Sequence, residues 1–174
     1  MVATYGSGVI RYHIPTNEWI CYDSICDNSN PLKESKLTNI YIDSKKTLLF
    51  ASEGQGIFFY DYKTDSFKNI SETDGLPNGV IYGILDDPQG NWWMSSNKGI
   101  IRMNISDLHN IKLYTRDDGL QSNQFNYKSS YKALNGKFYF GGINGFSSFY
   151  PQDLIKNKNT VLPSIEITQI DILG

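Results

Sequence analysis

The chain has 174 residues, enough for one domain with a hydrophobic core, and its 40% hydrophobic and 20% charged residues are typical of a soluble globular protein. A formal net charge of −2 without a long basic run excludes the surface expected of a nucleic-acid-binding protein, so we expect no nucleic-acid partner. The 12 Tyr, 9 Phe and 15 Gly, with the glycines in turn-like contexts, favour many short β-strands.

The N-terminal segment, YGSGVIRYHIPTNEW from Tyr5, has strand character but begins in what should be the second or third strand of a larger unit. Cys21 and Cys26 follow, with no Cys or His at zinc-ligand spacing, so we predict free thiols or a local disulfide and no metal site. His13 and His109 each come just after a predicted strand, where a solvated position is a better interpretation than catalysis. No stretch resembles a signal peptide or a membrane span.

The next two segments repeat the same series of short strands. Between residues 37 and 70 the predicted strands are LTNIYID, TLLFAS, GIFFYDY and SFKNI, and between residues 80 and 115 they are 80–85, 91–95, 99–104 and 111–115. DLHNIKL, residues 107–113, is the one weak candidate for a helix. The fourth segment, from Gly119 to Leu154, ends in FYPQDL before a polar linker, IKNKNTV.

Glycines followed by an apolar strand recur about every 45 residues, the length of one blade of a β-propeller. These glycines are Gly8, Gly56, Gly99 and Gly145, and TDGLPNG at Gly75 recurs as DDGLQSN at Gly119. A period of this length with four strands in each unit predicts an all-β protein, a β-propeller fragment of about three and a half four-stranded blades.

The repeat also bears on the most distinctive stretch, DDPQGNWW. Trp92 and Trp93 align with large residues in other copies, which predicts strand packing; the aligned pairs are Leu49 with Phe50 and Phe138 with Tyr139. We expect Leu49, Trp92 and Phe138 to occupy equivalent positions. Asp86 and Asp87 align with Asp43 and Ser44 before a tight turn, so hydrogen bonding to the local backbone is a better interpretation than a paired acid and base.

The stretch GLPNGVIYGILDDPQGNWWMSSNKGIIRMN closely resembles the two-component regulator propeller repeat. The segment from Gly119 to Leu154 resembles the last repeat before that family's immunoglobulin-like domain, and PSIEITQIDILG resembles the first strand of that domain. The resemblance implies propeller blades over residues 1–154 and a linker with that first strand over residues 155–174. MSSNKG replaces the usual Gly-Thr-x-x-Gly run, and Gln121 replaces the usual proline.

The resemblance further implies a periplasmic, ligand-sensing part of a membrane-anchored hybrid two-component sensor, with the histidine kinase elsewhere in the parent protein and no enzyme or cofactor in this segment. An oligosaccharide is the expected ligand, because planar polar groups on blade turns bind sugar hydroxyls. The candidate ligand-binding residues are Asn97, Lys98, Gln124, Asn126 and Asn144. Each is also an ordinary turn residue. Two alternatives remain: a propeller glycosidase or lyase, and a structural or dimerisation scaffold.

A fragment of three to four blades leaves the broad faces of its end blades without cover. Exposed apolar patches of this kind are uncommon on soluble monomers. We therefore expect a homodimer or another form of self-association, with a small closed ring of four blades as the alternative.

Overall fold

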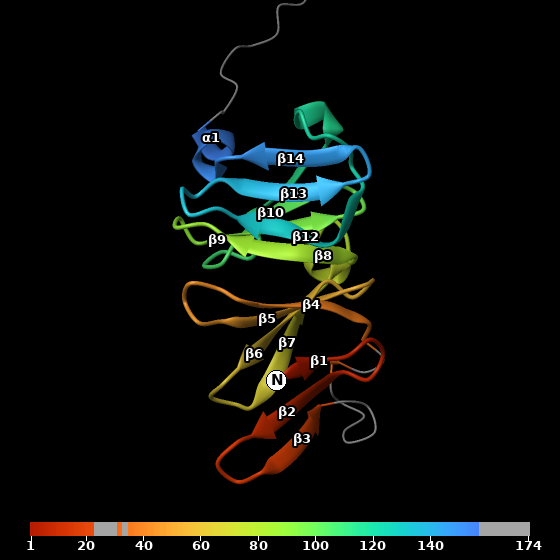
Figure 1. Cartoon of the computed structure of the whole chain (residues 1–174), viewed down its shortest axis with the longest axis vertical. Coiled ribbons are helices and arrows are strands. Elements are labelled where there is room, and N and C mark those ends of the chain that lie inside the picture. The colour runs from red at the N-terminus through yellow and green to blue at the C-terminus, as the bar shows by residue number, and fades with distance from the viewer. Residues whose placement is uncertain (23–30, 33–34, 157–174) are drawn as a thin grey trace, which may run out of the picture.

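The structure is a computed structural model that describes residues 1–22, 31–32 and 35–156. Within these residues, strands β1–β14 form four antiparallel sheets, which follow one another along the chain and stack along the long axis of the molecule (Figure 1). We number the sheets in chain order. Sheet 1 contains β1–β3, sheet 2 contains β4–β7, sheet 3 contains β8–β11 and sheet 4 contains β12–β14. This confirms the predicted all-β propeller fold.

The strand bounds follow the four-strand repeat. Sheet 1 consists of β1 (Val2–Ala3), β2 (Val9–His13) and β3 (Glu18–Tyr22). Sheet 2 consists of β4 (Leu37–Ile42), β5 (Leu48–Ser52), β6 (Ile57–Asp61) and β7 (Ser66–Ile70). Sheet 3 consists of β8 (Ile81–Asp86), β9 (Asn91–Ser96), β10 (Ile100–Asn104) and β11 (Ile111–Tyr114). Sheet 4 consists of β12 (Phe125–Lys132), β13 (Phe138–Gly142) and β14 (Gly145–Phe149).

Short helical segments join and follow the sheets. The 3-10 helices Glu72–Asp74 and Arg116–Asp118 lie in the two equivalent loops that begin the GLPNG and GLQSN segments, and each ends at a glycine with positive φ. Helix α1 (Pro151–Lys156) follows β14. Its first residue is proline, whose fixed φ suits the first helical position.

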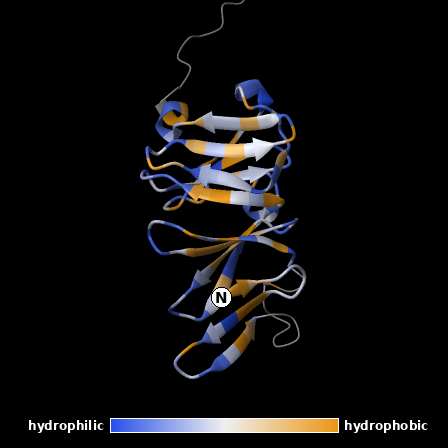
Figure 2. Cartoon of the chain, in the orientation of Figure 1, coloured by the Kyte–Doolittle hydropathy of each residue, from blue (hydrophilic) through white to orange (hydrophobic). Residues whose placement is uncertain are grey.

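Apolar side chains between neighbouring sheets form three successive cores. Leu48, Phe50 and Tyr60 belong to the core between sheets 1 and 2, and Leu49 and Trp92 belong to the core between sheets 2 and 3. Trp93, Phe138 and Phe140 belong to the core between sheets 3 and 4. The strands carry the hydrophobic residues and the turns the hydrophilic ones (Figure 2). Alternate residues of an inner sheet therefore face opposite neighbours.

The register corrects one detail of the predicted alignment. In sheet 3, Trp92 of β9 pairs with Asp86 of β8 and Met103 of β10. In sheet 2, the residue of β5 with the corresponding pairs is Leu48, which lies opposite Ile42 and Tyr60. Leu48, not Leu49, is therefore equivalent to Trp92. Phe138 is equivalent to Trp92, as predicted, through its pairs with Lys132 and Phe149.

The error has a simple cause in the hairpin turns. The turn after β5 closes from Ser52 to Gly56, whereas the turn after β9 closes from Ser96 to Gly99 and is one residue shorter. Because the alignment of the repeats is anchored on the glycines after these turns, it places the residues of the preceding strand one position out of register. A shift of one residue along a strand moves the side chain to the opposite face of the sheet. By the same shift, Asp43 is equivalent to Asp87 and not to Asp86, because Asp43 and Asp87 each close the turn that follows the first strand of a sheet.

Two further predictions need correction. Residues 107–113 do not form a helix: Leu108 and His109 lie in a turn, and Ile111 begins β11. The sequence pattern also missed helix α1, which contains Ile155 and Lys156 of the expected linker. Cys26 and the expected final strand after Pro163 lie outside the described residues, so the prediction for the cysteines and the predicted second domain are untested.

The two end sheets each have three strands instead of four among the described residues. Sheet 1 lacks a strand equivalent to β4 and β8, whereas sheet 4 lacks one equivalent to β7 and β11. The inner strands β4, β8 and β12 lie next to each other in space, which brings their N-terminal ends together. This arrangement positions the candidate site.

Candidate functional site

Antiparallel order places two kinds of connection at the same end of all four sheets. The hairpin turns at residues 4–8, 52–56, 96–99 and 142–145 lie there, together with the loops 71–80 and 115–124 that enter β8 and β12. We call this end the loop end. Loops on a rigid scaffold are common binding sites because they vary without disturbing the core.

All five predicted ligand-binding residues lie at or close to the loop end. Asn97 is half-buried, and its Oδ1 accepts a hydrogen bond of 2.5 Å from Asn78 Nδ2. Lys98 is exposed in the same turn, and its backbone N–H donates to Ser96 Oγ. The structure thus gives Asn97 a role in fixing the turn beside loop 71–80. Contact with a ligand stays a prediction for both residues.

The other three lie around sheet 4. Gln124 Nε2 donates to Tyr82 Oη at 3.5 Å, which links sheet 4 to sheet 3. Asn126 is exposed on β12, and Asn144 is exposed in the last hairpin turn with its backbone N–H donating to Gln121 Oε1 at 2.8 Å. The structure therefore gathers Gln124 and Asn144 around Gln121, while Asn97 and Lys98 lie in the turn of sheet 3.

The sequence interpretation missed a cluster of tyrosines around one carboxylate, which we call the tyrosine cluster: Tyr5, Glu53, Tyr82 and Tyr127. The hydroxyl of Tyr5 donates a hydrogen bond to Glu53. The rings of Tyr82 and Tyr127 meet edge to face, with centroids 4.4 Å apart. Tyr5 and Tyr127 remain 62% and 49% exposed, so their rings are open to solvent. Each member of the cluster comes from a different sheet or its turn.

Backbone contacts hold the cluster in place. Tyr5 forms an isolated bridge with Lys36, and the Glu53 backbone N–H donates to the Lys36 carbonyl at 2.9 Å. Glu53 also forms a bridge with Val80, just before β8. The hairpin turns of sheets 1 and 2 are therefore fixed beside the start of sheet 3.

A bulge in β12 brings Tyr127 to the same place. The register between β12 and β13 shifts between Phe125 and Ser130, and Lys128 has a positive φ of 53°. Bulges of this kind re-aim side chains and are common near functional sites. Here the bulge presents Asn126, Tyr127 and Lys128, all of which are exposed.

Contacts within the cluster shift the pKa values of Tyr5, Glu53 and Tyr127. The hydrogen bond from Tyr5 lowers the pKa of Glu53, and Tyr127 and the charge of Lys36 act in the same direction. Burial, followed by the hydrogen bond to Glu53, raises the pKa of Tyr127 to about 12. At neutral pH the cluster therefore contains an ionised carboxylate beside neutral phenols. The ammonium of Lys36 lies 5.5 Å from the Tyr5 ring centroid and balances that charge.

Nearby donors engage the carboxylates of both Asp86 and Asp87, and the two residues have different partners. Asp87 accepts hydrogen bonds from the Asn91 backbone N–H at 2.9 Å and from Trp93 Nε1 at 2.8 Å. This confirms the predicted turn role for Asp87. Asp86 instead accepts from Tyr41 Oη at 2.5 Å and from the Ser44 backbone N–H at 3.1 Å, so it joins sheet 3 to sheet 2.

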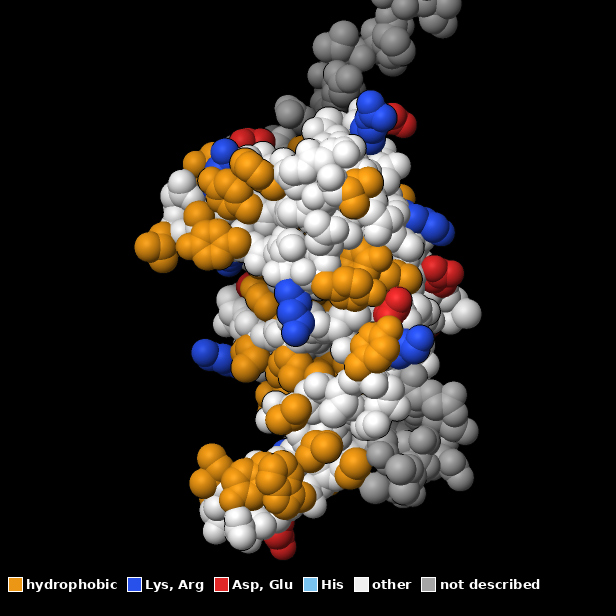
Figure 3. Space-filling model, turned by 45° about the vertical axis from the view of Figure 1, so that its right-hand side comes forward, with side chains coloured by type: hydrophobic (Ala, Val, Ile, Leu, Met, Phe, Trp, Pro, Cys, Tyr) orange, Lys and Arg blue, Asp and Glu red, His pale blue; other side chains and the backbone are white. Residues whose placement is uncertain are grey.

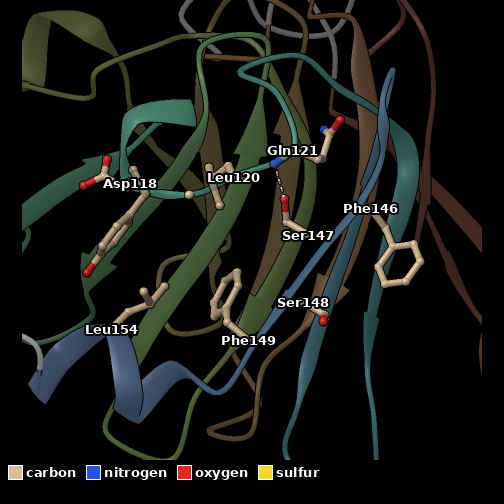
Figure 4. Close-up of a pocket in the computed structure, with 10 residues that line it drawn as sticks. Asp118, Leu120, Gln121, Phe146, Ser147, Ser148, Phe149 and Leu154 are labelled. Carbon is tan, nitrogen blue, oxygen red and sulfur yellow. Dashed lines mark hydrogen bonds between the residues drawn. The ribbon is translucent and has the colours of Figure 1, made fainter.

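A separate pocket of about 280 Å³ lies between loop 118–121, β14 and α1 (Figure 4). Leu120, Phe149 and Leu154 line its apolar side, while Phe146 points away from them on the opposite side of β14. The Gln121 backbone N–H donates to Ser147 Oγ at 3.0 Å, so two of the polar groups in the pocket already bond each other.

Within the described part of the chain, no group of three His, Cys, Asp or Glu side chains is arranged to hold a metal ion. His13 and His109 are both exposed, and His13 Nδ1 lies 2.8 Å from Thr16 Oγ1. No helix among these residues is long and apolar enough to cross a membrane. Both histidines are exposed as predicted, but His13 is the last residue of β2 and does not follow the strand.

Residues 75–98 match the family model of the two-component regulator propeller. These residues are therefore similar to one repeat of this family. The match includes residues 75–80 of the loop, strands β8 and β9 and the Asp87 turn between them, and it ends at Lys98, in the turn that contains two predicted site residues.

Histidine kinase P4 of Formosa agariphila is 28% identical to this chain over 217 aligned positions, which cover 97% of this chain and 16% of that protein. The chain therefore spans a small part of the curated relative that it matches.

Solved structures share the fold at lower identity. The extracellular domain of the hybrid two-component system BT3049 of B. thetaiotaomicron matches with a TM-score of 0.69 and 18% identity, over 87% of this chain and 20% of that one. The extracellular domain of BT4673 of the same organism matches with a TM-score of 0.70 and 23% identity, over 86% of this chain and 22% of that one. PorZ, a surface component of the type-IX secretion system of Porphyromonas gingivalis, matches with a TM-score of 0.63 and 17% identity, over 90% of this chain and 24% of that one.

Proposed function

We propose that this chain forms part of the extracytoplasmic sensing region of a hybrid two-component sensor and binds an oligosaccharide at the loop end. The propeller repeat, the similarity to a histidine kinase and the fold shared with extracellular domains of two such systems support the sensing role. The kinase activity belongs to another part of the parent protein. The tyrosine cluster is the observation that supports ligand binding.

The chemistry of the cluster suits a neutral sugar. Exposed tyrosine rings offer apolar faces with a polar tip, which can stack on the C–H face of a pyranose while the hydroxyl bonds its rim. The ionised carboxylate of Glu53 accepts hydrogen bonds from sugar hydroxyls, and such charge-assisted bonds are stronger than neutral ones. Because Lys36 balances Glu53, the cluster has no excess charge that would favour an acidic polysaccharide.

The test is calorimetric titration of the 174-residue chain with a panel of neutral oligosaccharides, among them xylo-, manno- and cello-oligosaccharides, and with oligogalacturonate as the acidic comparison. We expect a neutral oligosaccharide to bind and Tyr127→Ala to weaken it at least ten-fold. Glu53→Gln should weaken it less, because the amide still accepts a hydrogen bond. Tyr62→Ala is the matched control, since Tyr62 is 64% exposed but lies outside the loop end, after β6.

Binding of the acidic oligosaccharide alone would contradict the charge argument. Equal loss of binding in Tyr127→Ala and Tyr62→Ala would contradict the location. Release of shorter sugars during the titration, detected by chromatography, would instead favour a glycosidase or lyase.

A further inference from the structure

Another pocket, of about 330 Å³, lies at the end of sheet 2 that is opposite to the loop end. Strand order brings the β4–β5 turn and the β6–β7 turn together there, on the left of Figure 1. The lining residues, 45–47 and 59–63, all belong to these two turns or to the end of β6. We call it the basic pocket. Sheet 2 packs against a neighbouring sheet on each face, so the walls of the basic pocket lie within the stack.

Three aromatic rings form the apolar wall of the basic pocket. Phe59 is half-buried, and its ring centroid lies 6.4 Å from that of Trp92 in sheet 3. Tyr60 is buried, and its hydroxyl accepts a hydrogen bond of 2.6 Å from Arg11 Nη1 in sheet 1. The Tyr62 ring meets the Tyr60 ring edge to face, with centroids 4.8 Å apart, and is 64% exposed. Contacts with both neighbouring sheets therefore fix two rings, and the third is open to solvent.

The same pocket is lined by three ammonium groups. Lys45, Lys46 and Lys63 are exposed, and none of them forms an ion pair with another described residue. The one acidic residue of the lining, Asp61, has a partner outside it, because Lys68 Nζ lies 3.6 Å from Asp61 Oδ2. At the level of sheet 2, the left-hand side of Figure 3 shows Lys or Arg side chains beside hydrophobic ones. The basic pocket thus has an excess of positive charge.

The β4–β5 turn has a lysine where the equivalent turns after β8 and β12 have glycine. In each turn, the backbone N–H of this residue donates to the carbonyl three residues before it, and φ is 67° at Lys46, 81° at Gly90 and 83° at Gly136. A side chain is strained in this left-handed region. Strained residues of this kind cluster at functional sites. The strain therefore supports a function for the Lys46 side chain.

Hydrogen bonds hold the β4–β5 turn in place without a ligand. The Asp43 carboxylate accepts from the backbone N–H groups of Lys45 at 2.9 Å and Thr47 at 2.7 Å, and from Trp92 Nε1 at 3.1 Å. A Cβ atom on Gly90 would lie 3.6 Å from Lys45 Nζ, so this ammonium group lies beside the corresponding turn of sheet 3. A turn that is already ordered loses little conformational entropy when a ligand binds.

The chemistry of the basic pocket suits a flat apolar anion better than a sugar. A sugar has hydroxyl groups around its ring and needs several directed polar partners, whereas this pocket combines aromatic rings with ammonium ions. An aromatic ring packs well against other aromatic rings. An anionic group accepts charge-assisted hydrogen bonds from lysines. The volume is at the lower end of the range for small-molecule sites, which suits a ligand with one ring.

We propose that the basic pocket binds a small aromatic carboxylate. Its ring lies against Phe59, Tyr60 and Tyr62, and its carboxylate lies between the lysines. The inference is independent of the proposed oligosaccharide, which binds at the opposite end of the sheets.

NMR titration of the 15N-labelled 174-residue chain with 4-hydroxycinnamate tests this proposal. The amide signals of residues 44–47 and 61–63 should shift, and the dependence of the shifts on concentration gives the Kd. The neutral amide of the same acid keeps the ring and lacks the charge. It should bind about ten-fold more weakly, the effect of losing a hydrogen bond to a charged group. Acetate, which has the charge and lacks the ring, should leave these signals unchanged at the same concentration.

Lys46→Gly separates binding from folding, because glycine adopts a positive φ without strain. This variant should weaken binding of 4-hydroxycinnamate by about three- to five-fold, as expected for one exposed charge pair. Its Tm should not fall. Lys128→Gly is the matched control: Lys128 is also exposed and has a positive φ of 53°, but it lies in β12 of sheet 4. It should bind 4-hydroxycinnamate as wild type does.

Two tyrosine variants distinguish this pocket from the tyrosine cluster. Tyr62→Ala should weaken binding of 4-hydroxycinnamate and leave oligosaccharide binding unchanged, and Tyr127→Ala should do the reverse. Failure of one site therefore leaves the result for the other intact. Equal affinity for the acid and its amide would overturn the proposal, as would unchanged affinity in Lys46→Gly or an absence of shifts at millimolar 4-hydroxycinnamate. The same shifts with inorganic phosphate would also overturn it, because charge alone would then explain binding.

Discussion

At the scale of single residues, the adjacent carboxylates of Asp86 and Asp87 serve different contacts. Asp87 closes its own turn and holds the indole of Trp93, which keeps the ring in the core between sheets 3 and 4. Asp86 lies between three sheets: Tyr41 and Ser44 come from sheet 2, and Lys132 Nζ, at 3.8 Å from its carboxylate, comes from sheet 4. Asp86 therefore connects sheets 2, 3 and 4 through its side chain.

We predict that Asp86→Asn destabilises the chain by about 1.5–3 kcal/mol at neutral pH, the range for hydrogen bonds to a charged group. Burial raises the pKa of Asp86, but the hydrogen bonds from Ser44 and Tyr41 and the charge of Lys132 outweigh burial, so the pKa lies below its usual value. The stability that the ionised form adds is therefore present above the unfolded pKa, about 3.9. It is lost as the pH falls through the folded pKa.

Urea unfolding from pH 7 to pH 3 measures this effect. The difference in stability between wild type and Asp86→Asn should shrink in the acid range. Asp117→Asn, which changes an exposed carboxylate, is the control and should change little at any pH. A difference that is constant with pH would show that the charge of Asp86 does not contribute.

Trp93→Ala should lower the free energy of unfolding by about 3–5 kcal/mol, because it truncates a fully buried aromatic side chain. It also leaves the Asp87 carboxylate with one donor fewer. Where the variant is folded, ligand binding at the loop end should persist. Urea unfolding and calorimetric titration measure the two quantities, and unchanged stability with lost binding would place Trp93 in the ligand site.

At the scale of elements, the hairpin turns after β5 and β9 depend on a glycine for two reasons. Gly56 and Gly99 have positive φ, and a Cβ atom on either would lie 2.1 Å from a carbonyl oxygen of the outermost strand, that of Ile70 or of Tyr114. A Cβ so close to a carbonyl would force the outermost strand away.

This contact predicts that alanine substitution at two glycines lowers the free energy of unfolding by different amounts. Gly119 also has positive φ but has no atom within 4 Å of the added Cβ, so Gly119→Ala should lower the free energy of unfolding only by the backbone strain, about 1–2 kcal/mol. Gly99→Ala should cost clearly more, because strand β11 must also move. Thermal unfolding measures the stability of both variants, and the difference between them gives the contribution of the contact between the added Cβ and β11. Equal losses would mean that the turn relaxes without disturbing β11.

At the scale of the whole molecule, the sheets form a linear series in which each packs only against its neighbours. In such a series, stability is close to a sum of unit and interface contributions, and the ends have one interface fewer. We predict that backbone amides in β2 and β3 exchange with deuterium faster than those in β9 and β10, which have a core on each face. Mass spectrometry of a dilute sample measures this, and equal protection would contradict a stepwise series.

The periodicity of the sequence determined the fold, because the glycine turns recur at the length of a blade and each unit contains four short alternating strands. The expected strands match β4–β11 to within about a residue, the usual uncertainty of element ends. The same local logic found the turn role of Asp87. It missed α1, where six residues after a proline give too short a pattern to separate a helix from a turn.

Only the tertiary structure decided which face each side chain takes and which turns meet. A one-residue difference between two hairpins moved the position equivalent to Trp92 from Leu49 to Leu48, and no spacing in the sequence shows where a turn closes. The tyrosine cluster has the same origin. Tyr5, Glu53 and Tyr127 are far apart in the chain, and they meet because stacked sheets align their turns and a bulge in β12 redirects Tyr127.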